Sequence, residues 1–344
     1  MQEDQERNED LERKKEIYGK LRNGEFDAVE DAALALLDRN LSDADGELFL
    51  KISKFWKNRL ELFEYSEENG EKLFREWDVF LDFCVQNRLE NRKAVLSVKE
   101  FVFTNVVDTL IEAFRSSPLP SVETLVMLGQ AFYEIGVSDR AIETLEYAQS
   151  LARDEGDARI CLLLGNLYAE KGDGSLAMVM FNDAFLRFPQ QVDLDSVDFP
   201  PVEKIRGMVE KDGFVDNEVA EWVPVYGYFY NALTVKRSID YREYEELRRK
   251  LTDYEKSLKV DRKVVGIIIP RLVNYYLWMF DYHFYQVSAF GSCRNIVRRI
   301  DELLESLPLR PSQDELVKRK LRDRAFQVFS NILAGSSEKS NTKE

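Results

Sequence analysis

The stretch CLLLGNLYAEKGDGSLAMVMFNDAF, from Cys161 to Phe185, decides the fold class of this chain. An earlier stretch, LVMLGQAFYEIGVSDRAIETLEYAQ from Leu125 to Gln149, has the same pattern 36 residues before it, measured from Gly129 to Gly165. In both copies small and large apolar residues alternate on two helical stripes, with a glycine-containing turn between them. A period of this length predicts stacked helical hairpins, because one hairpin cannot bury its apolar face alone.

The expected packing positions agree between the two copies. The first copy has Leu125, Leu128, Gly129, Phe132, Ala141, Leu145 and Ala148. The second copy has Cys161, Leu164, Gly165, Tyr168, Ala177, Phe181 and Ala184, followed by Pro189. Glycine and alanine let two helices approach closely, and the large side chains fill the wider gaps between them. Any helix pair needs some small residues, but two copies in register rarely arise by chance.

This pattern resembles the tetratricopeptide repeat family, whose repeat runs large–x–x–Leu–Gly–x–x–Tyr, then small, aromatic, small and a closing proline. The resemblance covers roughly residues 121–190, and the second copy matches it best. Three features depart from the family. Leu125 and Cys161 stand where the family has tryptophan, Arg153 replaces the first proline, and the period is two residues longer than ~34. We expect the two extra residues of this longer period in the loop 153–157.

The resemblance implies a concave groove, lined by the first helix of each repeat, that receives a peptide of a partner protein. Carried onto this sequence, the groove residues are Val126, Gln130, Tyr133, Glu134, Arg159, Leu162, Asn166 and Glu170. The amides of Gln130 and Asn166 lie one repeat apart and match the donors and acceptors of an extended peptide. The lysines that hold a terminal carboxylate in some members are replaced by Val126 and Leu162.

The composition argues against catalytic and metal-binding functions. The chain has one histidine, His283, and three isolated cysteines without a CxxC motif, so a histidine metal cluster and a disulfide framework are not expected. Asp193, Asp195 and Asp198 lack the glycine and glutamate of a calcium loop. We find no catalytic constellation and no phosphate-binding loop, and we predict a non-enzymatic protein without metal or cofactor.

The charge of the chain bears on its partners and its location. The net charge is −15 and lies entirely in the first 190 residues, which disfavours binding to nucleic acid or anionic lipid. The N-terminus is too charged for a signal peptide, and the apolar run at 264–270 is far shorter than the ~20 residues of a membrane helix. We expect a soluble cytoplasmic protein that binds no membrane. Whether a leader peptide has been removed from the chain stays open.

The remaining segments also have helical periodicity, so we predict an all-α, tetratricopeptide-like solenoid with degenerate repeats before the two good copies and a divergent helical region after them. The predicted domains are 1–119 (degenerate pairs), 120–190 (two repeats), 191–216 (linker and short helix), 217–335 (C-terminal helices) and 336–344 (disordered tail). Outside the two copies, helices are expected at 9–22, 26–39, 46–66, 70–86, 91–103, 105–118, 217–236, 241–258, 261–286, 289–306 and 312–334, with a kink or break at Pro270.

Aromatic residues gather at 222–230 and 275–285, either as core or as an interface through which the chain self-associates.

From the repeats and the resemblance they show, we predict an adaptor that binds a peptide or helix of a partner protein. Two alternatives stay open. One is an acidic chaperone that holds clients in the same groove. The other is a helical enzyme with a C-terminal site, which a pocket with a perturbed carboxylate near Trp222 or His283 would favour.

Overall fold

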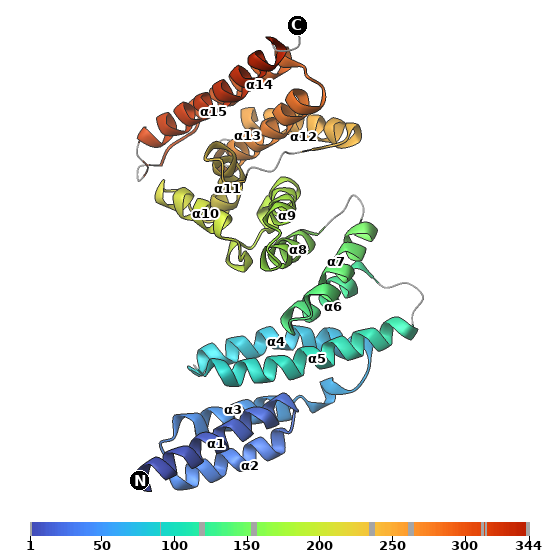
Figure 1. The fold of residues 1–344 in the computed structure, drawn as a ribbon, viewed down its shortest axis with the longest axis vertical. Helices are drawn as coiled ribbons and strands as arrows, with labels where there is room; N and C mark the ends of the chain where they lie inside the picture. Colours follow the sequence, from blue (N-terminus) through green and yellow to red (C-terminus); the bar gives the residue numbers. More distant parts are fainter. Residues whose placement is uncertain are drawn as a thin grey trace. The chain divides into compact units, whose positions relative to one another are not determined.

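The computed structural model describes residues 2–89, 91–116, 121–152, 157–233, 238–260, 265–310, 313 and 315–341. Within these ranges the chain is helical and contains no strand, as predicted (Figure 1). Contacts divide the chain into two compact units, Met1–Glu155 and Gly156–Glu344. None of the described helices combines the length and the apolar character needed to cross a membrane.

The first unit consists of helices that pack mainly against their neighbours in sequence. They are α1 (Gln2–Arg22), α2 (Phe26–Arg39), α3 (Ala44–Lys57), η1 (Leu60–Phe63), α4 (Glu67–Gln86), α5 (Arg92–Ser116), α6 (Val122–Glu134) and α7 (Ser138–Ala152). The tightest pairs are α2 with α3, α4 with α5, and α6 with α7. α5 also packs against α1 and α6, so it is the central element of this unit (Figure 1).

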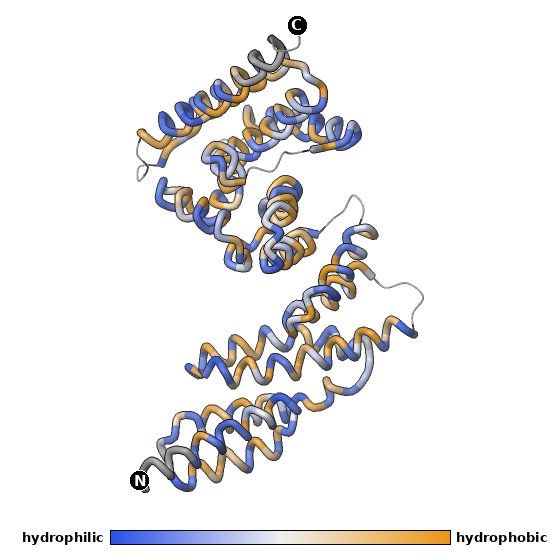
Figure 2. Tube along the Cα trace, viewed as in Figure 1, coloured by the Kyte–Doolittle hydropathy of each residue, from blue (hydrophilic) through white to orange (hydrophobic). Residues whose placement is uncertain are grey.

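Side-chain caps fix where several of these helices begin. The side chains of Asp43, Ser66 and Ser121 accept hydrogen bonds from the backbone N–H groups of Gly46, Asn69 and Thr124. Each bond satisfies a donor that the first turn of a helix leaves unpaired. Apolar and polar residues alternate along the helices that follow (Figure 2), so each helix buries one face and exposes the other.

Two predicted boundaries in this unit differ from the structure. The segments 91–103 and 105–118 were expected as two helices, but residues Arg92–Ser116 form the single helix α5; Pro118 lies outside the described residues. No glycine or proline interrupts this stretch, and Val102, Val106 and Leu110 are all fully buried. The helix expected over 46–66 ends at Lys57 and is followed by η1.

The second unit has one continuous apolar core. Its elements are α8 (Ala158–Glu170), α9 (Gly174–Arg187), η3 (Pro189–Gln191), η4 (Leu194–Ser196), α10 (Pro200–Lys211), α11 (Asn217–Phe229), α12 (Tyr241–Val260), α13 (Val265–Asp281), the π-helix η5 (Tyr282–Gln286), α14 (Phe290–Glu305) and α15 (Glu315–Asn341). α13 packs against α11, α12 and α14, and it continues through Pro270, where a kink or break was expected. Both aromatic clusters contribute to the core, through Trp222, Tyr226 and Phe280 among others.

The structure divides the chain at a different place from the sequence-based prediction. The segment 191–216 was expected to be a linker, but Val197, Phe199, Ile205 and Phe214 are buried in the core of the second unit. A disordered tail was expected from residue 336, whereas α15 extends to Asn341. The contacts divide the two units after Glu155.

The two repeated stretches form the helical hairpins α6/α7 and α8/α9, as their pattern predicts. Leu128, Phe132, Ala141, Leu164, Ala177, Phe181, Ala184 and Pro189 are buried, and Tyr168 is half-buried. The helix pairs are close at the expected glycines. A Cβ atom added to Gly129 would lie 2.6 Å from Leu145, and one added to Gly165 would lie 2.7 Å from the ring of Phe181.

The two hairpins belong to different units, α6/α7 to the first and α8/α9 to the second. Each hairpin packs within its own unit, α6 against α5 and α9 against α11. The stacking of one copy on the other therefore stays a prediction from the sequence.

We expect Gly165→Ala to destabilise the second unit by about 1–3 kcal/mol, because the new Cβ would overlap the ring of Phe181 in a packed core. Gly207→Ala in α10 is the matched control. Nothing lies within 4 Å of a Cβ at Gly207, so this change should stabilise the helix by about 0.5–1 kcal/mol. Urea denaturation measures both, and equal effects of the two substitutions would contradict the close approach of α8 and α9.

Candidate functional site

The predicted groove residues of the first copy lie on α6, and most of them are at least partly covered. Val126 is buried, whereas Gln130 and Tyr133 are half-buried. Glu134 forms an ion pair with Lys99 of α5. The side of α6 that was expected to face a peptide is therefore partly engaged by α5.

The predicted groove residues of the second copy lie on α8. Leu162 belongs to the apolar core of its unit, whereas Arg159 and Glu170 are exposed. Asn166 is buried, and both atoms of its carboxamide are hydrogen-bonded. Nδ2 donates to the Ser196 carbonyl at 2.7 Å, and Oδ1 accepts from the Asp198 N–H at 2.9 Å. Asn166 therefore holds the segment that follows η4, a role different from the peptide contact expected of it.

The eight residues are divided between the two units, four on α6 and four on α8, so neither unit contains the groove predicted across both copies.

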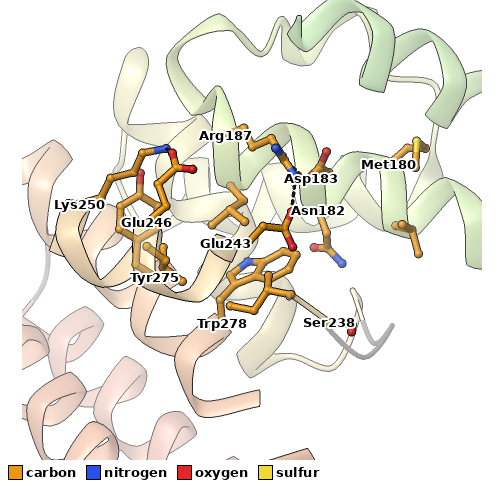
Figure 3. Close-up of a pocket in the computed structure, with 14 residues that line it drawn as sticks. Met180, Asn182, Asp183, Arg187, Ser238, Glu243, Glu246, Lys250, Tyr275 and Trp278 are labelled. Atoms are coloured by element: carbon orange, nitrogen blue, oxygen red, sulfur yellow. Dashed lines mark hydrogen bonds and ion pairs between the residues drawn. The ribbon is translucent and has the colours of Figure 1, made fainter. Parts of the chain in front are cut away.

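Another feature has the properties of a binding site. A cavity of about 290 Å³ lies within the second unit, between α9, α12 and α13 (Figure 3). Its apolar wall is formed by Leu186, Ile239, Leu247, Tyr275 and Trp278. Concave sites with an apolar wall and a few polar groups are typical of ligand binding.

Asn182 of α9 is the polar residue that sets this cavity apart. It borders the cavity, its exposed fraction is 3%, and neither Nδ2 nor Oδ1 has a hydrogen-bond partner among the described residues. Each unpaired buried polar group costs about 1–3 kcal/mol. Such a residue in an otherwise well-packed helix is a candidate for contact with a ligand.

The rim of the cavity is charged, and its charges are paired with each other. The Arg187 guanidinium donates to Asp183 at 2.7 Å and to Glu243 at 2.8 Å, which links α9 to the first turn of α12 (Figure 3). Lys250 pairs with Glu246 at 2.8 Å, and its ammonium lowers the pKa of that carboxyl. The rim thus has three carboxylates and two cations.

Glu243 also fixes the start of α12. Its carboxylate accepts from the Asp240 N–H at 2.9 Å, while the Asp240 carboxylate accepts from the Glu243 N–H at 2.8 Å. This reciprocal pair is a capping box. The same carboxylate therefore both starts the helix and receives Arg187 across the rim.

The π-helix η5 holds another part of the wall. The Gln286 carboxamide donates to the Ile239 carbonyl at 2.9 Å and accepts from the Ile239 N–H at 3.5 Å. In the same turn, His283 lies 3.3 Å from the Tyr244 hydroxyl, and burial lowers the pKa of its imidazole. π-helical turns recur at functional sites because the extra residue redirects side chains.

A buried ion pair lies outside the cavity, beside Trp222. Arg271 of α13 binds Glu221 of α11 through two nitrogens and also donates to the Tyr254 hydroxyl at 2.7 Å. Burial raises the pKa of Glu221, and the guanidinium opposes that effect. This carboxylate, whose pKa is perturbed and which lies next to Trp222, is bound by Arg271 and Gln190 and does not line the cavity.

No protein-family model matches this chain, and no curated protein matches its sequence significantly. Among the described residues, no three His, Cys, Asp or Glu side chains are arranged to hold a metal ion.

Asn182 was not among the residues predicted from the sequence, although one feature pointed to it. Asn182 lies four residues after Met178 and three before Phe185, on the apolar side of a largely hydrophobic helix. A polar residue in such a stripe needs a partner. Whether Asn182 finds a partner in its own unit depends on α12 and α13, which lie 59 to 99 residues further along the sequence (241 − 182 and 281 − 182).

Breaking the buried ion pair should destabilise the second unit strongly. We expect Arg271→Met to cost about 3–5 kcal/mol, because it leaves the Glu221 carboxylate buried without its cation. The double variant Glu221→Leu/Arg271→Met should recover most of this loss, since no charge is then left unpaired. Urea denaturation of both variants measures the difference, and a double variant no more stable than the single one would contradict this account.

Proposed function

We propose that this protein is an interaction module that binds a segment of a partner protein in the cavity between α9, α12 and α13. The observation that carries the proposal is the buried, unpaired carboxamide of Asn182 beside an apolar wall. An apolar anchor gives affinity in such a site, and a few polar groups fix the orientation of the ligand.

The character of the rim supports binding over catalysis. Arg187 and Lys250 are each matched by carboxylates of the rim, and the Glu221 carboxylate is held by Arg271. A general acid or base must be free to exchange a proton with a substrate. We therefore propose a non-enzymatic function.

The repeated hairpins α6/α7 and α8/α9 also support a scaffold, since tetratricopeptide-like repeats, which these stretches resemble, commonly present rigid helical surfaces to partners.

We place the protein in the cytoplasm. Cys84, Cys161 and Cys293 are unpaired and buried, and burial raises the pKa of the Cys84 thiol to about 11, which fits a reducing compartment.

The test uses a random peptide display library, selected on the immobilised 344-residue chain. We expect enriched peptides whose affinity, measured by calorimetry, falls at least tenfold for Val179→Trp. Val179 lines the cavity and is 38% exposed, so the indole would obstruct the cavity without disturbing the core.

Leu176→Trp is the control, because Leu176 is similarly exposed on the same helix but does not line the cavity. It should leave the affinity unchanged. Failure to enrich any peptide, or equal binding by both tryptophan variants, would overturn the proposed function.

A further inference from the structure

Two side-chain carboxamides of the second unit, those of Asn166 and Gln286, each bind a carbonyl and an N–H group of a non-helical main-chain segment. Asn166 binds the carbonyl of Ser196 and the N–H of Asp198, one on each side of Val197, whose backbone is extended. Gln286 binds the carbonyl and the N–H of Ile239, in the non-helical segment before α12. In both cases one planar amide satisfies a donor and an acceptor of a non-helical segment.

Asn182 has the same chemical group and neither of these bonds. Its donor and its acceptor are both buried, and both are unpaired in the described part of the unit. A ligand that repairs this deficit must offer an acceptor and a donor close together. The main chain of an extended peptide does so at every residue, whereas the interior of a helix has already paired its N–H and C=O groups.

We propose that Asn182 holds the main chain of an extended partner segment, with Nδ2 donating to a carbonyl and Oδ1 accepting from an N–H. An apolar side chain of the segment packs against Trp278 and Leu247, which form part of the cavity wall. This inference rests on the proposed function and specifies the conformation of the partner. Asn182 is the residue that selects an extended segment over a helix.

The charges of the site restrict the partner further. Three carboxylates and two cations surround the cavity, so its rim has one more negative than positive group. An acidic segment would be repelled on approach and would compete with Asp183 and Glu243 for Arg187. The partner segment is therefore neutral or basic next to its apolar anchor.

The first test compares stability with binding in Asn182→Leu. Leucine has the same number and branching of side-chain heavy atoms and removes two unpaired polar atoms, so we expect the melting temperature to rise by about 2–4 °C. The affinity for a peptide selected on the wild-type chain should fall at least tenfold. Asn166→Leu is the matched control. Its Nδ2 and Oδ1 are both hydrogen-bonded, so the same change should lower the melting temperature.

The second test modifies the peptide. In a scan of the selected peptide, N-methylation at one position should reduce affinity at least tenfold, while alanine at that position is tolerated. That combination shows recognition of an N–H group rather than of a side chain. Asn182→Leu should remove the sensitivity to methylation, because the acceptor Oδ1 is then missing.

The outcomes separate this inference from the proposed function. If Val179→Trp blocks binding while Asn182→Leu binds like the wild type, the cavity is the binding site and main-chain recognition by Asn182 is wrong. A lower melting temperature for Asn182→Leu would show that the amide is already satisfied in the free protein, which also overturns the inference. If Val179→Trp has no effect, the proposed function itself fails.

Discussion

The Glu221–Arg271 pair is the constraint on which the second unit depends. It joins α11 to α13 where both charges are largely removed from water, with exposed side-chain fractions of 2% and 14%. Gln190 of η3 and Tyr254 of α12 complete its hydrogen bonds, so four elements meet at one guanidinium–carboxylate contact. A purely apolar contact would tolerate sliding of these helices, whereas the fork of an arginine fixes both distance and direction.

The position of α13 in turn determines the cavity. Tyr275 and Trp278 follow Arg271 by one and two helical turns, and they form the wall facing α9. Asn274 donates to the Phe185 carbonyl at 3.3 Å, which ties α13 to the last turn of α9. The pair, the wall and the unpaired amide of Asn182 are therefore connected through the same packed helices, and a site whose residues are positioned before binding loses little entropy when it binds.

The sequence predicted those features that depend on nearby residues. The two hairpins and the contact of Gly165 with Phe181 follow from a local repeat. The continuous helix α5 and the buried segment after Pro189 were not predicted, because their structure depends on what covers them. For the site, the periodicity correctly placed Asn166 on α8, but the assigned role differs because Ser196 and Asp198 approach it through tertiary folding. Asn182 was missed for the same reason, since only the folded unit shows that its amide has no partner.

The π-helical turn η5 has a consequence for how this protein tolerates change. The Val287 N–H donates to the Tyr282 carbonyl five residues earlier, so this turn holds one residue more than an α-helical turn. Loss of any one residue here would restore ordinary helical geometry and rotate the preceding or following side chains by about 100°. Gln286 would then no longer face Ile239. The length of the chain in this turn, together with the Gln286 carboxamide, keeps this part of the cavity wall in place, and homologous proteins that retain the cavity should retain that length.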